Sequence, residues 1–191
     1  MKTTSCRRLY DYWNERRGSR AAPERGDLDP GAIAPLLSDS FMLAVDASAG
    51  HPLRLAGTRM CAWFCREIKG ESFDHLFTDD CRRDVKDLVA IVSDELAPLV
   101  AGISAKSADD LPSASLELLL LPLYVRGRGD SRLLGMLAPL NVPYWMGTYP
   151  VVELSLGVRR HLRAIDAPTL VPQRLPQAIR RSWVVLDGGR H

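Results

Sequence analysis

The spacing of apolar residues predicts two amphipathic helices in this chain. The first spans Ser5–Arg17, where apolar side chains recur at intervals of three and four residues and therefore share one face. That face consists of Cys6, Leu9, Tyr10 and Trp13. The second helix runs from Asp79 to about Leu96 with the same spacing and stops before Pro98. Each helix needs an apolar surface to cover.

Strand-like segments lie between and after these helices. Phe41–Asp46 and Leu53–Thr58 are separated by a turn that contains Gly and Pro, and they predict an antiparallel hairpin with the leucines of its second strand at alternate positions. Three further segments follow the second helix with short connections and predict an antiparallel meander. These segments are Leu99–Ser107, Ser115–Val125 and Ser131–Leu140.

The segment Ser115–Val125 is apolar at successive positions in its middle, so both of its faces need cover. Leu116 and Leu118 share one face, whereas Leu119 and Leu121 share the other. A sheet without a second layer would leave the second pair exposed. We therefore expect the N-terminal helix to cover that face.

The remaining segments are less regular. Asp29–Leu37 predicts a short helix with Ile33, Leu36 and Leu37 facing inward. Arg59–Ile68 predicts a helix buried on most sides, and 72–77 predicts a helical turn. We expect a turn at 127–130, a proline-rich linker at 168–176 and an edge strand at 183–187. Residues 151–165 are apolar but interrupted by Arg, which favours a strand and leaves a helix open.

Composition places the chain among ordinary globular domains. Of its 191 residues, 46% are hydrophobic and 25% are charged, which excludes a disordered chain, a collagen-like chain and a disulfide scaffold. No apolar run approaches the roughly 20 residues needed to span a bilayer, so no membrane association is expected. The polar N-terminus predicts no signal peptide, and we therefore expect a cytoplasmic protein whose four cysteines stay reduced.

The charge distribution does not indicate a polyanionic partner. The formal net charge is +2, and residues 151–191 are mildly basic, with 7 of the 25 Lys/Arg and 3 of the 23 Asp/Glu residues. The arginines in that segment are dispersed and have few aromatic residues among them, which favours a solvated surface over a nucleic-acid site. We expect no nucleic-acid partner.

Residues with catalytic or metal-binding chemistry are present but do not form a recognisable motif. Paired acids stand at element ends, and nucleophile, zinc-protease, phosphate-loop and dinucleotide motifs are absent from the sequence. Cys61 and Cys65 are four residues apart, yet no histidine stands at a usual ligand spacing, so we expect structural cysteines and no metal. An enzyme that uses Cys61, Cys65 or His75 is a remote alternative.

The order of elements is helix, two strands, a group of short helices, one long helix and three strands. In that order the chain resembles the short PAS-domain proteins of alphaproteobacteria, a group of unknown function. The resemblance covers nearly the whole length. It is carried by LYDYWNERRG (9–18), RGDLDPGAIAPLL (25–37), FMLAVD (41–46), LRLAGTRMCAWF (53–64), GESFDHLF (70–77), LELLLLPL (116–123) and VVLDGGR (184–190).

The resemblance implies an α+β fold of the PAS type, with a five-stranded antiparallel sheet and helices inserted after the second strand. Residues 1–37 are then an N-terminal helical cap, 38–145 the PAS-like core and 146–191 a C-terminal extension. The family implies sensing or regulation rather than catalysis, and it brings no invariant ligand and no set of catalytic residues.

The resemblance also implies a cavity between the sheet and the inserted helices. The apolar residues expected to line it are Met60, Trp63, Phe64, Phe77, Leu88, Val92, Leu118 and Met136. We therefore expect a sensory or regulatory module that is gated by a small apolar or amphipathic ligand. The alternative is that the same side chains fill a solid core, which leaves a ligand-free interaction and dimerisation module. Haem ligation by His75 is disfavoured, and no other cofactor is expected.

The expected partners are a second copy of the chain and a separate signalling protein, such as a kinase or a cyclic-nucleotide enzyme. PAS domains commonly self-associate through an N-terminal helix and the outer sheet face. The candidate interface consists of Leu9, Tyr12, Trp13, Leu119 and Leu121. Tyr12 lies off the apolar stripe of the helix, which leaves aromatic surface for a partner.

Overall fold

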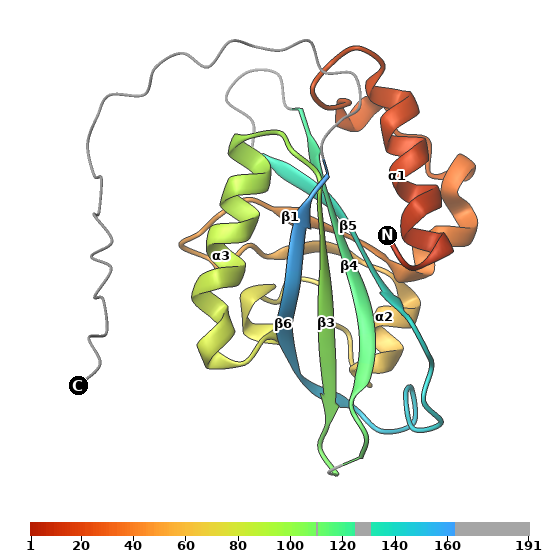
Figure 1. The fold of residues 1–191 in the computed structure, drawn as a ribbon, viewed down its shortest axis with the longest axis vertical. Coiled ribbons are helices and arrows are strands. Elements are labelled where there is room, and N and C mark those ends of the chain that lie inside the picture. The colour runs from red at the N-terminus through yellow and green to blue at the C-terminus, as the bar shows by residue number, and fades with distance from the viewer. Residues whose placement is uncertain (110, 125–130, 163–191) are drawn as a thin grey trace, which may run out of the picture.

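The computed structural model describes residues 1–109, 111–124 and 131–162. Three of the predicted segments, at 127–130, 168–176 and 183–187, lie outside those residues. The described chain forms an antiparallel sheet with helical elements on both faces (Figure 1). This α+β arrangement, with helices inserted between the second and third strands, agrees with the expectation from the sequence.

Within the described residues the sheet has six strands rather than the expected five, in the order β2-β1-β5-β4-β3-β6. The strands are β1 (Ser40–Ala44), β2 (Leu53–Ala56), β3 (Leu99–Ser107), β4 (Ala114–Leu123), β5 (Arg132–Pro139) and β6 (Val151–His161). The predicted hairpin is the β1–β2 pair, and the predicted meander is β3–β4–β5. The segment left open between strand and helix is β6, which pairs along the free edge of β3. Part of the predicted C-terminal extension therefore belongs to the sheet.

The helical elements fall into two groups by position. Before β1 lie α1 (Thr4–Arg17) and the 3₁₀ segments η1 (Arg25–Asp27) and η2 (Gly31–Asp39). Between β2 and β3 lie α2 (Thr58–Trp63), the 3₁₀ segment η3 (Asp74–Leu76) and α3 (Asp79–Asp94). Both predicted amphipathic helices, α1 and α3, are confirmed.

Two short helices differ from their predicted form. The segment expected as a helix up to Leu37 is a 3₁₀ segment, because Pro35 lies inside it and cannot donate a helical hydrogen bond. Leu37, expected to face inward, is 39% exposed. The helix expected up to Ile68 ends at Trp63, and Cys65 then has a φ of +51°, which a continuing right-handed helix does not permit.

The buried apolar residues form two cores, one on each face of the sheet. The inner core lies between the sheet and the elements inserted after β2, and it holds Leu116, Leu118 and Leu120 of β4. The outer core lies between the sheet, α1 and η2, and it holds Leu119, Leu121 and Leu123 of the same strand. The predicted cover of β4 from both sides is confirmed.

A β-bulge divides the leucines of β2 between the two faces. Leu53 pairs with Leu43 and Leu55 pairs with Met42, so Arg54 is an extra residue at a shift in the β1–β2 register. Leu53 is consequently buried in the inner core, whereas Leu55 lies beside Met42 of the outer core and is 51% exposed. The alternate spacing of the two leucines therefore does not place them on one face.

Candidate functional site

Seven of the eight residues expected to line a ligand cavity lie in the inner core. Met60, Trp63, Phe64, Phe77, Leu88, Val92 and Leu118 are all buried there. Around them the ring of Phe73 stacks on Phe41, with centroids 5.2 Å apart, and meets Phe77 edge-on at 5.3 Å. The sequence therefore identified the residues that α2, α3 and β4 bring together on this face of the sheet.

Met136, the eighth residue, lies on the opposite face, and its assignment to the inner face is wrong. It pairs directly with Leu119 across the β4–β5 ladder, and paired residues of antiparallel strands point to the same side. Both belong to the outer core. The inner-facing residues of β5 are Leu133 and Leu137.

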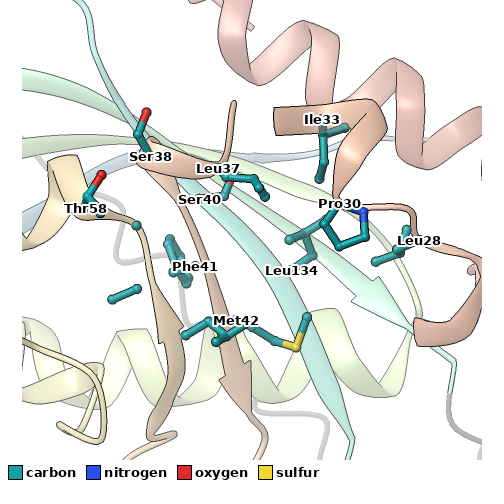
Figure 2. Close-up of a pocket in the computed structure, with 13 residues that line it drawn as sticks. Leu28, Pro30, Ile33, Leu37, Ser38, Ser40, Phe41, Met42, Thr58 and Leu134 are labelled. Atoms are coloured by element: carbon teal, nitrogen blue, oxygen red, sulfur yellow. The ribbon is translucent and has the colours of Figure 1, made fainter. Parts of the chain in front are cut away.

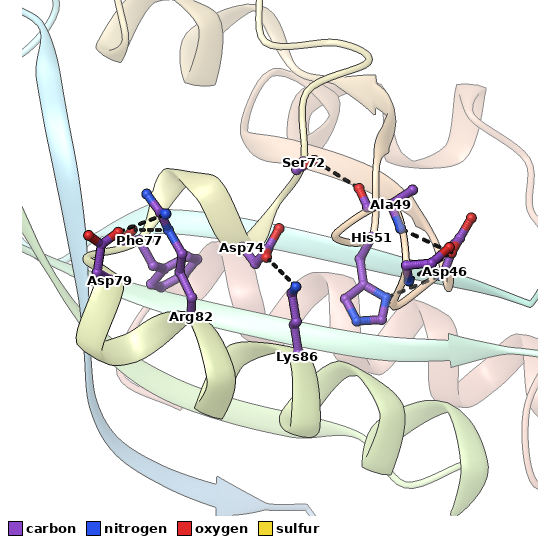
Figure 3. Close-up of polar contacts among 10 residues, drawn as sticks. Asp46, Ala49, His51, Ser72, Asp74, Phe77, Asp79, Arg82 and Lys86 are labelled. Carbon is purple, nitrogen blue, oxygen red and sulfur yellow. Dashed lines mark hydrogen bonds and ion pairs between the residues drawn. The ribbon is translucent and has the colours of Figure 1, made fainter.

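A buried polar cluster stands beside the inner core, where the β1–β2 turn meets α3 (Figure 3). Asp74 of η3 is fully buried, and its Oδ2 lies 3.2 Å from the Nζ of Lys86 on α3. Within the described part of the chain neither carboxylate oxygen accepts a hydrogen bond. Lys86 is therefore the group that offsets the buried charge of Asp74.

His51 completes this cluster from the β1–β2 turn. Its Nδ1 accepts a hydrogen bond from the backbone N–H of Asp46 at 3.1 Å, while its Nε2 is buried without a hydrogen-bond partner among the described residues. The pKa of His51 is lowered, chiefly because burial penalises the charged ring. The carboxylate of Asp74 opposes that shift, and the ammonium of Lys86 reinforces it. The ring is therefore held neutral.

Gly50 allows the turn to approach Asp74 closely. Its φ is +69°, and a Cβ built on it would lie 2.1 Å from the Oδ1 of Asp74. No other residue fits at that distance in that conformation. The sequence analysis missed both His51 and Asp74, because a histidine in a turn and an acid in a helical turn carry no periodic signal.

On the outer face, α1 is fixed to the sheet by polar contacts at both of its ends. Glu117 of β4 accepts hydrogen bonds from the backbone N–H of Lys2 at 2.6 Å, from the N–H of Thr3 at 2.8 Å and from its hydroxyl at 2.7 Å. Burial alone would raise the pKa of Glu117, but these hydrogen bonds outweigh it and lower the pKa. At the other end, Nε1 of Trp13 donates to the carbonyl of Pro122 at 2.8 Å.

The residues expected at a dimer interface are occupied within the single chain. Leu9, Trp13, Leu119 and Leu121 are fully buried in the outer core. The hydroxyl of Tyr12 accepts a hydrogen bond from the N–H of Asp29 at 2.6 Å and lies 3.3 Å from its carbonyl. Tyr12 is half-buried, so its hydroxyl is engaged within the chain while part of its ring stays exposed. A homodimer stays a prediction, and an interface made of these residues requires α1 to leave the sheet.

A pocket of about 380 Å³ opens on the same outer face, where the cover by α1 and η2 ends (Figure 2). Its floor is Met42, Leu134 and Leu55, and its walls include Ile33 and Leu37. Its lining is mostly aliphatic. None of the eight residues expected from the sequence to line a cavity borders this pocket. Leu55 reaches the pocket through the bulge in β2, and Leu37 reaches it from a 3₁₀ segment. Neither the bulge nor the 3₁₀ segment was predicted from the sequence.

The residues considered for enzyme chemistry are Cys61, Cys65 and His75. The pKa of the Cys61 thiol is raised, chiefly by burial, and its Sγ lies 3.3 Å from Glu67 rather than beside a cation. Cys65 is exposed beyond the end of α2, and His75 is exposed on η3. Across the described ranges no group of three or more His, Cys, Asp or Glu residues is placed to hold a metal.

The loop between β5 and β6 displays apolar side chains to solvent. Val142 is 66% exposed, Tyr144 is 79% exposed and Tyr149 is also exposed. Trp145 in the same loop is fully buried, and its Nε1 donates to the carbonyl of Pro112 at 3.0 Å. The buried tryptophan thus anchors a loop that exposes Tyr144 and Tyr149, and tyrosine is enriched at protein interfaces.

No helix in the described part of the chain has the length and apolar character needed to cross a bilayer.

Comparison with known proteins gave one family and one reported structural match. The sequence model described as a PAS domain matches residues 1–138. The crystal structure of the PAS domain of an HTR-like protein from Haloarcula marismortui is 18% identical in sequence, with a TM-score of 0.41. That match covers 57% of this chain and 89% of the other. The comparison with curated proteins gave no match.

Proposed function

This chain belongs to the PAS domain family, which indicates a sensory or regulatory module, and from that premise we propose that it acts through contact with a separate signalling protein. We further propose that a small apolar or amphipathic ligand gates this contact. The partner is a protein with its own output activity, such as a kinase or a cyclic-nucleotide enzyme. The exposed loop between β5 and β6 carries this proposal.

That loop supports a role in protein contact for two reasons. Tyr144 and Val142 expose neighbouring apolar surface on one loop, and tyrosine is enriched among the residues that contribute most to binding at interface centres. Trp145 holds the loop to the body of the domain through the carbonyl of Pro112, so the exposed residues are presented from a fixed base. A preorganised loop loses less conformational freedom on binding than a free one.

Ligand gating is supported by the arrangement of the outer face. The pocket is lined by Ile33 and Leu37 of η2, which covers this face together with α1, so occupancy of the pocket changes the surroundings of η2. A ligand that binds one arrangement of this cover more tightly than another shifts the population between them. Such a shift alters the surface that a partner meets.

The test is capture followed by reconstitution. A Val142→Ser/Tyr144→Ser variant and the wild type are crosslinked in native cells, with Val158→Ser as control because Val158 is also highly exposed but lies on β6. We expect the wild type and the control to recover a kinase or cyclic-nucleotide enzyme that the loop variant does not recover. The activity of that purified enzyme is then expected to change when the wild-type chain is added.

Two outcomes contradict parts of the proposal. If the loop variant recovers the same proteins as the wild type, the loop is not the contact surface. If the partner responds to the chain equally in the presence and absence of apolar ligands, the ligand-free interaction module is the correct alternative.

A further inference from the structure

The floor of the outer-face pocket is a continuous apolar strip across three strands. Leu55 of β2 pairs with Met42 of β1, and Met42 pairs with Leu134 of β5, so the three side chains share one face. Met42 and Leu134 are nearly buried, whereas Leu55 is 51% exposed. The bulge at Arg54 is what turns Leu55 to this side. The strip therefore continues the outer core beyond the edge of its cover.

The walls of the pocket are held at a fixed distance from this floor. Gly57 packs so closely against η2 that a Cβ on it would lie 2.2 Å from the carbonyl oxygen of Ser38. Its N–H donates to the carbonyl of Ser40 at 2.8 Å, and Arg59 forms an ion pair of 2.5 Å with Asp39. These contacts bind the end of η2 to the start of α2. The opening is therefore part of the fold and not a gap between loosely placed segments.

The pocket has a polar end and an apolar end. Figure 2 shows Ser38 and Thr58 together on one side, and Leu28, Pro30 and Ile33 on the other. Ser40, by contrast, already donates its hydroxyl hydrogen bond to the carbonyl of Leu36. Within the described ranges the hydroxyls of Ser38 and Thr58 make no hydrogen bond, so both are available to a ligand.

We propose that this outer-face pocket binds an amphipathic molecule with a flexible hydrocarbon chain. The chain lies over Leu55, Met42 and Leu134, and the polar end lies at Ser38 and Thr58. This inference rests on the proposed function, because it names the site and the chemical class of the gating ligand. It differs from the expectation of a cavity between the sheet and the inserted helices.

Size and lining both favour such a molecule. Ligand pockets commonly measure roughly 300–1,000 Å³, and this pocket, at about 380 Å³, lies at the lower end of that range. Apart from Phe41, the apolar part of its lining is aliphatic, and a methionine such as Met42 adapts its shape to a flexible chain. A planar aromatic ligand would find little ring surface to stack on.

The test measures binding of decanoate and of decan-1-ol, below their aggregation concentrations, by isothermal titration calorimetry. Leu55→Asp places a charge in the strip at a half-exposed position, and Leu37→Asp does the same in the wall. We expect each variant to weaken binding about tenfold or more, since one apolar contact of this size is lost. Val152→Asp is the matched control, because Val152 is 47% exposed on the opposite edge strand and lies outside the pocket.

A second variant tests the polar end. Thr58→Val keeps the shape of the side chain and removes its hydroxyl, and we expect it to weaken binding of both probes about threefold to tenfold. Retained circular dichroism and an unchanged melting temperature confirm that each variant is folded. Absence of binding to the wild type, or equal binding to the wild type, Leu55→Asp and Leu37→Asp, overturns the proposal.

One further variant separates failure of the site from failure of the function. Leu88→Met alters the inner core at nearly constant volume. If this change weakens probe binding and Leu55→Asp does not, the ligand lies in the inner core and the proposed function stands without this site. If the probes bind at the pocket but leave the partner enzyme unaffected, the site stands and ligand gating fails.

Discussion

The two faces of this sheet are covered by different means, and a pocket opens at the edge of one of the two covers. The inner face is covered by α2, η3 and α3, which are inserted between two strands and are therefore tied to the sheet at both ends. The outer face is covered by α1 and η2, which precede the first strand and are linked to the sheet along the chain through β1. The outer cover ends over β2, where the pocket lies.

This difference teaches that a core can be closed by chain connectivity or by individual contacts. On the outer face the cover depends on Glu117, Trp13 and Tyr12, each of which bonds a backbone group of a distant segment. Weakening one of these contacts should affect the outer face before the inner face. The predictions below test that order.

The largest expected effect compares Trp13→Ala with Phe73→Ala, because both side chains are nearly or fully buried, one in each core. Each substitution is expected to lower the free energy of unfolding by about 3–5 kcal/mol. Urea denaturation followed by far-UV circular dichroism measures it. Trp13→Ala should also expose α1 to hydrogen exchange while α3 stays protected. A uniform loss of protection would show that the two covers are one cooperative unit.

Glu117→Gln is expected to cost about 2–3 kcal/mol, because three donors lose a charged acceptor in a buried site. The same carboxylate should make the stability of the fold depend on pH. Since folding lowers the pKa of Glu117 below its usual 4.5, its contribution is complete above that value and is lost as the pH falls through the lowered pKa. Denaturation midpoints between pH 3 and 7 measure this loss of stability, and Glu117→Gln should make the midpoint depend less on pH at the acidic end. The same dependence of the midpoint on pH in both proteins would contradict this assignment.

Lys86→Met is expected to lower the free energy of unfolding by about 2 kcal/mol. This value lies between those for exposed and fully buried ion pairs, because Lys86 is itself partly exposed. The buried carboxylate of Asp74 loses its counter-charge, while the side-chain volume is nearly kept. Removing the ammonium should also raise the pKa of His51, which NMR titration of the ring measures. A double-mutant cycle with Asp74→Asn isolates the pair. Additive losses in that cycle would show that the two groups do not interact.

Tyr12→Phe is the smallest change and is expected to cost about 1 kcal/mol, the worth of the hydrogen bond that its hydroxyl accepts from Asp29. The loss should appear as faster hydrogen exchange in η2 with little change in α3. Tyr10→Phe is the matched control, since Tyr10 lies on the same helix and its hydroxyl makes no hydrogen bond within the described ranges. Equal losses of stability in the two variants would show that the hydroxyl of Tyr12 does not help to hold the outer cover.

The elements that the sequence predicted correctly are those whose periodicity lasts for several turns or strand repeats. Cys6, Leu9 and Trp13 define α1, and the successive leucines of β4 require two covers, because each face of a strand takes alternate residues. Such patterns are local to one element. The partial success with the inner core follows, since Leu88, Val92 and Leu118 each lie on an element of this kind.

The features that the sequence did not predict depend on how elements meet. The face of Met136 depends on the β4–β5 register, and the face of Leu55 depends on one extra residue in β2. The hydroxyl of Tyr12 is engaged by a segment 17 residues away. Asp74 and His51 come together only when the β1–β2 turn approaches α3. No single-residue pattern carries these relationships.

The bulge in β2 also has a consequence for how such a domain diverges. Deleting one codon, that of Arg54, would remove the extra residue and place Leu55 directly after Leu53, so that regular alternation would still turn Leu55 to the outer face beside Met42. An insertion of one residue between the two leucines, absorbed as a bulge, likewise leaves both faces unchanged. Related chains can therefore gain or lose one residue in this edge strand without changing the floor of the pocket or rebuilding either core.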